Sequence, residues 1–260
     1  MTAHCAMRRG CLWFNMVRVG IRIGRRQSVM KKMLHGLLGA VMALCFAMLT
    51  LTALIDGLGA SQPMMLSLMR RYAPPEETGL PEAEYPGMAA MIAGYLAGKQ
   101  AEFQYAWTDG QGQTMEAFRD NEQQHMADCR GLFVLCRRVL MAALAGFCLT
   151  LALTWALRAK RDAARGFLAG GGLTLVAVLV LAVWGLADFD GLFILFHQLS
   201  FDNGLWLMNP AENLLIRLMP IQFFIHEAAV LAASWLGLMA LAMAAAWTMR
   251  RSRGGGSEQT

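Results

Sequence analysis

Four apolar runs constrain what this chain can fold into more than any other feature of its sequence. A transmembrane helix needs about 20 mostly apolar residues. Runs of this kind lie at residues 34–55, 139–157, 166–187 and 221–249. Only 16% of the residues are charged, whereas soluble domains carry about 25%. Four such runs in one chain argue against a soluble protein that buries each of them, and they predict an all-α integral membrane protein with four transmembrane helices.

The placement of basic residues predicts how the chain crosses the membrane. Lys and Arg near the ends of transmembrane helices concentrate on the cytoplasmic side. Most of the 23 basic residues lie before the first run, between the second and third, or after the fourth. We therefore expect a multi-pass protein with both termini in the cytoplasm. Residues 56–138 and 188–220 are then extracytoplasmic segments, and residues 250–260 form a cytoplasmic tail.

The first 29 residues are expected to be a non-native or disordered extension. The stretch MKKMLHGLLGA, a methionine and two lysines directly before an apolar run, is typical of a natural start. Arg25 and Arg26 can be encoded by a ribosome-binding sequence shortly before the Met30 codon. We therefore hypothesise that translation starts at Met30 and that residues 30–249 form a single membrane domain. Detection of a native peptide covering residues 9–18 would contradict this hypothesis.

The two outer segments predict different kinds of helix. The longer one contains the helix-favouring stretches YPGMAAMIAGYLAGK and TMEAFRDNEQQHMADCRGLFVLCRR, and we expect the second to run directly into the second span. In the shorter one, Phe189, Phe193 and Phe196 repeat at helical spacing within an apolar run that is too short to cross a bilayer. We therefore expect an extracytoplasmic helical head and an interfacial helix between spans three and four. The pair Gly166 and Gly170 indicates close helix packing within the third span.

Two polar groups lie in these outer segments. In the stretch EQQHMADC, His125 and Asp128 share one helix face with Glu122 and Cys129. The second group centres on His197, in an unusually apolar and aromatic setting. A solvated helix face and a polar tip reaching lipid headgroups are the alternative interpretations. A metal site is also chemically possible, but without an HExxH or CxxC pattern we predict none, and spacing alone leaves the function open.

The order of several short motifs resembles the bacterial lipoprotein intramolecular transacylase family (Lit). The resemblance covers roughly residues 33–249 and includes the placement of the motifs between four spans. The sequence departs from the family pattern at Asn213, where the family usually has Asp. The matching residues are Tyr95, Leu96, Gly98, His125, Met126, Asp128, Phe196, His197, Phe201, Trp206, Pro210, Leu215, Ile216, Pro220, Phe223 and Phe224.

The resemblance implies a membrane acyltransferase of the bacterial cell envelope. Its substrates would be lipoproteins whose N-terminal Cys carries a diacylglyceryl group and a free α-amine. The enzyme would move the sn-2 acyl chain from glycerol to that amine and leave a lyso-form lipoprotein. The resemblance implies no cofactor and no nucleic-acid partner; the partners would be diacylglyceryl lipoproteins and membrane lipid.

The resemblance also implies roles for individual residues. We expect His125 to act as general base and acid, and Asp128 to orient an imidazole. His197 would help to transfer the proton or donate to the oxyanion. A covalent acyl-imidazole is the alternative. The residues expected to bind the substrate are Trp206, Phe201, Phe196 and Arg217, the first three around the acyl chain and the last at an oxyanion or phosphate.

Two other classes of function remain alternatives to the acyltransferase. The chain could be a non-enzymatic membrane binding or assembly protein whose outer helices dock a partner. It could also be a metal-dependent membrane hydrolase that uses His125, Asp128 and His197. Chelator-sensitive activity would favour the hydrolase, and metal-free rearrangement of a lipopeptide's acyl chains would favour the acyltransferase.

Overall fold

Four long helices dominate the computed structural model, which describes residues 3–251 and, for the side chains, residues 26–251. These helices are α1 (Ala3–Gly59), α5 (Asp120–Ala156), α6 (Lys160–Ala187) and α9 (Ile221–Arg251). Each contains one of the predicted apolar runs and is long and apolar enough to cross a membrane. The prediction of a helical membrane protein with four spans is therefore confirmed. Helix α1 continues back to Ala3, and translation from Met30 stays a prediction.

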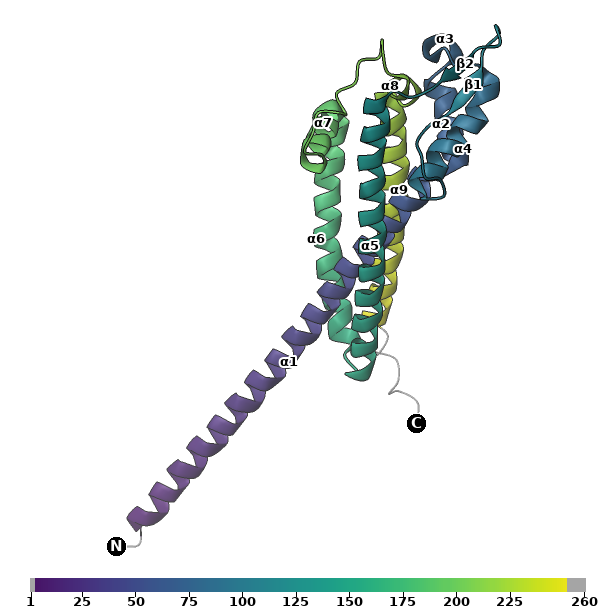
Figure 1. The fold of residues 1–260 in the computed structure, drawn as a ribbon. Coiled ribbons are helices and arrows are strands. Elements are labelled where there is room, and N and C mark those ends of the chain that lie inside the picture. Colours follow the sequence, from purple (N-terminus) through teal and green to yellow (C-terminus); the bar gives the residue numbers. More distant parts are fainter. Residues whose placement is uncertain (1–2, 252–260) are drawn as a thin grey trace.

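The second half of α1 crosses the bundle and packs against α5, α6 and α9, whereas its N-terminal part projects away from the other helices (Figure 1). Its contact with α6 is the closest, because small residues face each other at the crossing. A Cβ atom at Gly166 would overlap the carbonyl of Gly36, and one at Gly39 would overlap the backbone of Ala163. At Gly170 an added Cβ would lie 3.0 Å from the Cα of Ala40. The close packing predicted around Gly166 and Gly170 is therefore confirmed, and it is the small-residue packing that membrane helices favour.

The first outer segment folds into a compact head at one end of the bundle (Figure 1). Its elements are α2 (Gln62–Tyr72), α3 (Pro75–Thr78), η1 (Glu82–Glu84), α4 (Tyr85–Leu96), β1 (Ala106–Thr108) and β2 (Thr114–Glu116). Tyr85, Met88 and Ile92 of α4 are fully buried in its core. The helix predicted at YPGMAAMIAGYLAGK is confirmed as α4.

The helix predicted from Thr114 onward begins later than expected. Residues 114–116 instead form β2, which pairs with β1 in an antiparallel hairpin. The Asp109 carboxylate accepts the backbone N–H groups of Gln111 and Gln113 at 2.8 Å, and Gly112 supplies a positive φ of 79°. This turn chemistry favours a hairpin over a helix. Helix α5 then starts at Asp120 and continues without interruption into the second span, as predicted.

The second outer segment contains two short helices. Helix α7 (Phe189–Ser200) follows α6 after a break at Asp188, whose Oδ1 accepts the N–H of Gly191 at 2.9 Å and caps the new helix. Helix α8 (Leu214–Leu218) packs against α3 in the head. The helix predicted from the phenylalanine spacing is thus present as α7, and its interfacial position in a membrane stays a prediction.

Candidate active site

His125 owes its position to the way in which α5 begins. Glu122 is fully buried in the first turn of α5. One of its carboxylate oxygens accepts the N–H of Arg119 at 2.8 Å, and the other accepts the N–H of Leu215 at 2.7 Å. The first contact is half of a capping box, and the second ties α8 to the start of α5. His125, one turn further along, is therefore held by both outer segments.

His197 lies in the last turn of α7 and is oriented by its own helix. Its Nδ1 is 2.7 Å from the carbonyl oxygen of Phe193, one turn earlier. A carbonyl can only accept, so the proton of the neutral ring is assigned to Nδ1. The lone pair of His197 then lies on Nε2, which is the nitrogen free to accept a proton.

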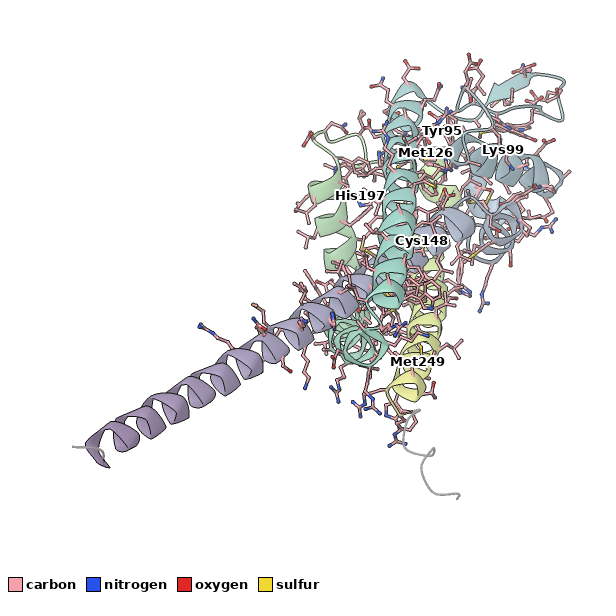
Figure 2. All side chains as sticks on the ribbon, turned by 90° about the horizontal axis from the view of Figure 1, so that it is seen from below. Tyr95, Lys99, Met126, Cys148, His197 and Met249 are labelled. Carbon is pink, nitrogen blue, oxygen red and sulfur yellow. The ribbon has the colours of Figure 1, made fainter. Side chains whose placement is uncertain are left out.

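The two histidines face each other across the gap between α5 and α7. Their ring centroids are 5.9 Å apart and the ring planes differ by 26°. Figure 2 labels His197 on α7 and Met126, the neighbour of His125, on α5. The predicted approach of His125 and His197 is confirmed by this distance, although the two residues lie on different outer segments. A small reacting group beside the two rings would be within reach of both.

An aromatic cage surrounds His197. Its ring centroid lies 5.3 Å from that of Phe196, 5.5 Å from that of Phe201 and 5.0 Å from that of Trp206. Phe193 closes the cage at 4.3 Å. Phe201 also contacts His125, with centroids 5.0 Å apart. The structure thus brings three of the four residues predicted to bind substrate directly against the histidine pair.

One nitrogen of His125 has no partner. Its Nε2 lies 3.5 Å from the Cys129 sulfur, one helical turn further along α5. Its Nδ1 is buried and has no hydrogen-bond partner among the described residues. An imidazole N–H is a stronger donor than a thiol, so we assign the proton to Nε2. Nδ1 then carries a buried free lone pair, which is the state a general base requires.

The apolar surroundings keep both imidazoles neutral. Burial, and after it the neighbouring His197, lower the pKa of His125 from 6.5 to about 4, while the Asp128 carboxylate acts in the opposite direction. Burial likewise lowers the pKa of His197, against the effect of its bond to Phe193. Burial and then Asp128 raise the pKa of the Cys129 thiol to about 12, so this thiol stays protonated. The site therefore presents two uncharged bases at neutral pH.

Asp128 lies beside the pair and binds a residue that the sequence analysis did not single out. Its Oδ2 accepts from the side-chain amide of Asn203 at 2.9 Å. Among the described side chains, Asp128 has no hydrogen bond to either imidazole, so its predicted orienting role stays a prediction and would act through charge. The contact closes the loop after α7 onto α5. The sequence offers no signal for it, because the two residues lie 75 positions apart.

Arg217 forms hydrogen bonds to backbone carbonyls and not to the histidine pair. Its Nε donates to the carbonyl of Asn213 at 3.4 Å, and its terminal nitrogen donates to the carbonyl of Glu77 at 3.4 Å. The second bond joins α8 to α3, and the role of Arg217 at an oxyanion or phosphate stays a prediction. Asn213 is buried, and its amide oxygen accepts the N–H of Asn209 at 3.2 Å. The family departure at this position thus lies in a structural turn.

Glu122 was a candidate for a metal site in the sequence, together with His125, Asp128 and Cys129. In the structure its two oxygens accept backbone N–H groups instead. Among the residues that the structure describes, no three His, Cys, Asp or Glu side chains are grouped so that they could hold a metal ion. The sequence signal for the observed role was incomplete, because Glu122 occupies the third position of the helix but Arg119 stands at the N-cap, where a capping box has Ser or Thr.

A bundle of four membrane-spanning helices, with paired histidines at the end that carries a packed head, defines a class of integral membrane enzyme. The chain belongs to the lipoprotein intramolecular transacylase (Lit) family, whose family model matches residues 40–224. The suspected membership is therefore confirmed, and with it the prediction of an enzyme that acts in a membrane. No curated protein matches the sequence.

Solved structures show the same fold. The structure of the membrane-integral Lit from Bacillus cereus superposes with a TM-score of 0.70 at 18% identity, covering 84% of this chain and 96% of that one. A variant of the same protein with one histidine replaced by arginine gives a TM-score of 0.70 at 17% identity, over 88% and 97% of the two chains. A third structure, with a histidine replaced by alanine, gives 0.69 at 16% identity, over 86% and 97%.

Proposed function

We propose that this enzyme moves the sn-2 acyl chain of a diacylglyceryl-modified lipoprotein from glycerol to the α-amine of the lipoprotein's N-terminal Cys. The observation that carries the proposal is the pair of neutral imidazoles in an apolar cage, with Nδ1 of His125 free of any partner in the described structure. Ester and amine belong to one substrate molecule, so no external acyl donor is needed. Holding them together exploits the large rate advantage of intramolecular reactions.

The chemistry needs one proton to move from nitrogen to oxygen. The neutral amine attacks the carbonyl carbon of the sn-2 ester, and the nitrogen becomes more acidic as it gains positive charge. Nδ1 of His125 accepts the amine proton and returns it to the departing glycerol oxygen as the C–O bond breaks. The products are an amide and a free hydroxyl, and no water is consumed. General acid–base help of this kind contributes roughly 10²- to 10⁴-fold in rate.

His197 is better suited to accept a proton than to donate one. Its Nδ1 proton is committed to the Phe193 carbonyl, which leaves a lone pair on Nε2. Of the two roles predicted for His197, proton transfer therefore fits the assigned tautomer, and donation to the oxyanion does not. The cage formed by Phe196, Phe201 and Trp206 excludes water and offers an apolar surface to the acyl chain.

We further infer that the histidine pair lies on the extracytoplasmic side, with both termini in the cytoplasm. The inference rests on the basic residues that follow Ala156 and Met249, at the end of the bundle opposite the head. A cysteine introduced at Glu84, in the head, should react with an impermeant maleimide added to intact cells. Labelling only after the membrane is opened would reverse the orientation.

The proposed reaction can be tested in a bacterial host that makes only diacylated lipoproteins. Expression of this protein should convert lipoprotein N-termini to the lyso-form, as read by mass spectrometry. His125→Ala and His197→Ala should each reduce conversion by about 100-fold or more. The double variant should be little worse than either single variant, because residues of one catalytic unit are not additive.

A matched control comes from the opposite end of the bundle. His35→Ala also removes an imidazole, but its ring lies beside Asp162, 4.0 Å away at the start of α6. This variant should convert lipoproteins normally. Near-normal conversion by His125→Ala, at equal protein levels in the membrane, would remove the proposed base and the mechanism with it.

A further inference from the structure

A cavity lies at the end of the bundle opposite the histidine pair. It has a volume of about 410 Å³ and is formed by the last turns of α5 and α9, the first turns of α6 and the facing part of α1. Phe46, Phe147 and Phe167 form much of its wall, and Met249, labelled in Figure 2, lines it from α9. Binding sites for small molecules span about 300–1,000 Å³, so the volume suits part of a lipid.

Packing at this end leaves the space unfilled. Helix α5 packs extensively against α1 but makes few contacts with α6. The walls contributed by α6 and α9 carry small side chains, including Ala163, Ala164 and Ala246. The lining is apolar except for Thr154 and Lys160. In a bilayer, an apolar space between helices is accessible to lipid chains, which are as apolar as the leucines around them.

Thr154 is the buried polar side chain of this cavity, and it lacks a partner. The hydroxyls of five other threonines in the long helices bond a carbonyl of their own helix at 2.7–2.9 Å; they are Thr50, Thr52, Thr150, Thr174 and Thr248. Thr154 is only 6% exposed, and its hydroxyl has no hydrogen-bond partner among the described residues. A buried hydroxyl without a partner is costly. An oxygen atom of a bound molecule would remove this cost.

The rim of the cavity is positively charged. Lys160 lines it and is the first residue of α6, where the helix dipole is also positive. Arg158, Arg161 and Arg165 lie nearby in sequence. The acid in this turn is Asp162, which pairs with Arg165 at 3.0 Å and lies beside His35. Cations gathered at a helix N-terminus repel its dipole unless an anion joins them, and basic pockets between membrane helices bind anionic lipid headgroups.

We propose that this cavity is a binding site for one anionic glycerophospholipid of the membrane. One acyl chain fills the space beside Phe46, Phe147 and Phe167. An ester oxygen of the lipid accepts from the Thr154 hydroxyl, and the phosphate lies against Lys160. The lipid fills the gap that α5 leaves toward α6 and α9. This site is separate from the histidine pair and its acyl-chain cage, and it does not depend on the proposed reaction.

Lipid titration of the purified protein in detergent tests the proposal. Native mass spectrometry should show one phosphatidylglycerol bound more tightly than phosphatidylcholine. Lys160→Gln should weaken phosphatidylglycerol binding about fivefold, the contribution of one lysine at an anionic surface. Arg161→Gln is the matched control, since Arg161 is exposed and does not line the cavity. Equal losses in both variants, or equal binding of both lipids, would mean diffuse surface attraction and would overturn the site.

Two further variants test the cavity itself. Ala246→Phe should fill the space and abolish tight phosphatidylglycerol binding, whereas Ala244→Phe, on the exposed face of α9, should preserve it. If the Ala246 variant does not fold, Thr154→Val decides the matter with almost no change in shape. It should weaken binding of the lipid several-fold. Unchanged binding in the valine variant would show that no lipid oxygen meets the hydroxyl, and the proposal would be wrong.

Discussion

The head and the four long helices differ in how completely they bury their side chains. A single continuous core joins α2 and α4 to Phe103, Phe118, Met126 and the residues of α8. Among the residues whose side chains are described, the transmembrane helices contain only small buried clusters, around Ala43 and around Trp235. In their most apolar windows, between 11% and 22% of the residues are buried inside the protein. The rest of their apolar surface faces outward, as expected of helices surrounded by lipid.

This difference explains where a precise site can be built. In water, burial of apolar surface drives a head to pack tightly. Between helices in lipid that driving force is absent, and association depends on close contact of small residues. Met126, beside His125, belongs to the core of the head. The histidine pair is therefore positioned by the tightly packed region, to which the four long helices are attached.

The largest difference between the two regions should appear at low pH, where protonation of His125 destabilises the head. The pKa of His125 is about 4 in the folded protein and about 6.5 in the unfolded chain. The unfolded chain takes up the proton first, so the stability is complete above pH 6.5 and is lost as the pH falls toward 4. The loss from this residue is about 3 kcal/mol. Thermal unfolding in detergent between about pH 7.5 and pH 4 should show it.

His125→Gln and His35→Gln form the matched pair for this measurement. The first variant should lose much of the pH dependence, because it removes the buried imidazole of the head. The second should retain the wild-type profile, because His35 lies at the other end of the bundle. A glutamine at position 125 with the full wild-type pH dependence would place the acid sensitivity outside the site.

A pair of polar substitutions compares the two regions directly. Both carboxylate oxygens of Glu122 accept buried N–H groups, and Glu122→Gln replaces one of these acceptors by an NH₂ donor. The variant should lose about 2 kcal/mol of unfolding free energy. Thr150→Val removes a hydroxyl that bonds only its own helix, to Gly146 at 2.8 Å, and should change stability by less than about 0.5 kcal/mol. Chemical denaturation of both variants is the measurement. Equal costs would contradict the distinction between head and spans.

Asp128→Asn should have the smallest effect. It should lower the rate of lipoprotein conversion and leave the stability of the protein unchanged. The carboxylate raises the pKa of His125 against the effect of burial. Its removal makes His125 a weaker base, so conversion should fall a few-fold while the protein level stays constant. The contact with Asn203 can survive, because the new side-chain amide would still offer an oxygen acceptor. Loss of folding in this variant would instead assign Asp128 a structural role.

The sequence predicted those features that depend on neighbouring residues. The spans follow from apolar runs, α7 follows from the spacing of Phe189, Phe193 and Phe196, and the glycine contact follows from Gly166 and Gly170. The resemblance to a family paired His125 with His197. The strands β1 and β2, of three residues each, are too short to show an alternating pattern.

The sequence did not predict contacts between segments that lie far apart in the chain, because no local pattern encodes them. Nothing near Asp128 predicts Asn203, and nothing near Glu122 predicts the N–H of Leu215. The free nitrogen of His125 depends on what the surrounding core leaves unpaired, which no local pattern encodes. The sequence therefore brought forward the two histidines that lie together, while their orientation and basicity come from the tertiary structure, and their part in the reaction stays a prediction.

The close contact between Gly36 of α1 and Gly166 of α6 also determines the order in which parts of the fold form during biosynthesis. Helices α1 and α5 can meet once the second span has entered the membrane, but Gly36 has no Gly166 to face until the third span is inserted. His197 follows still later, in α7. A nascent chain therefore carries His125 for some time without its partner, and the histidine pair forms only when three of the four spans are in place. Under the proposed mechanism, activity therefore arises late in synthesis, and an incomplete chain cannot alter the lipoproteins around it.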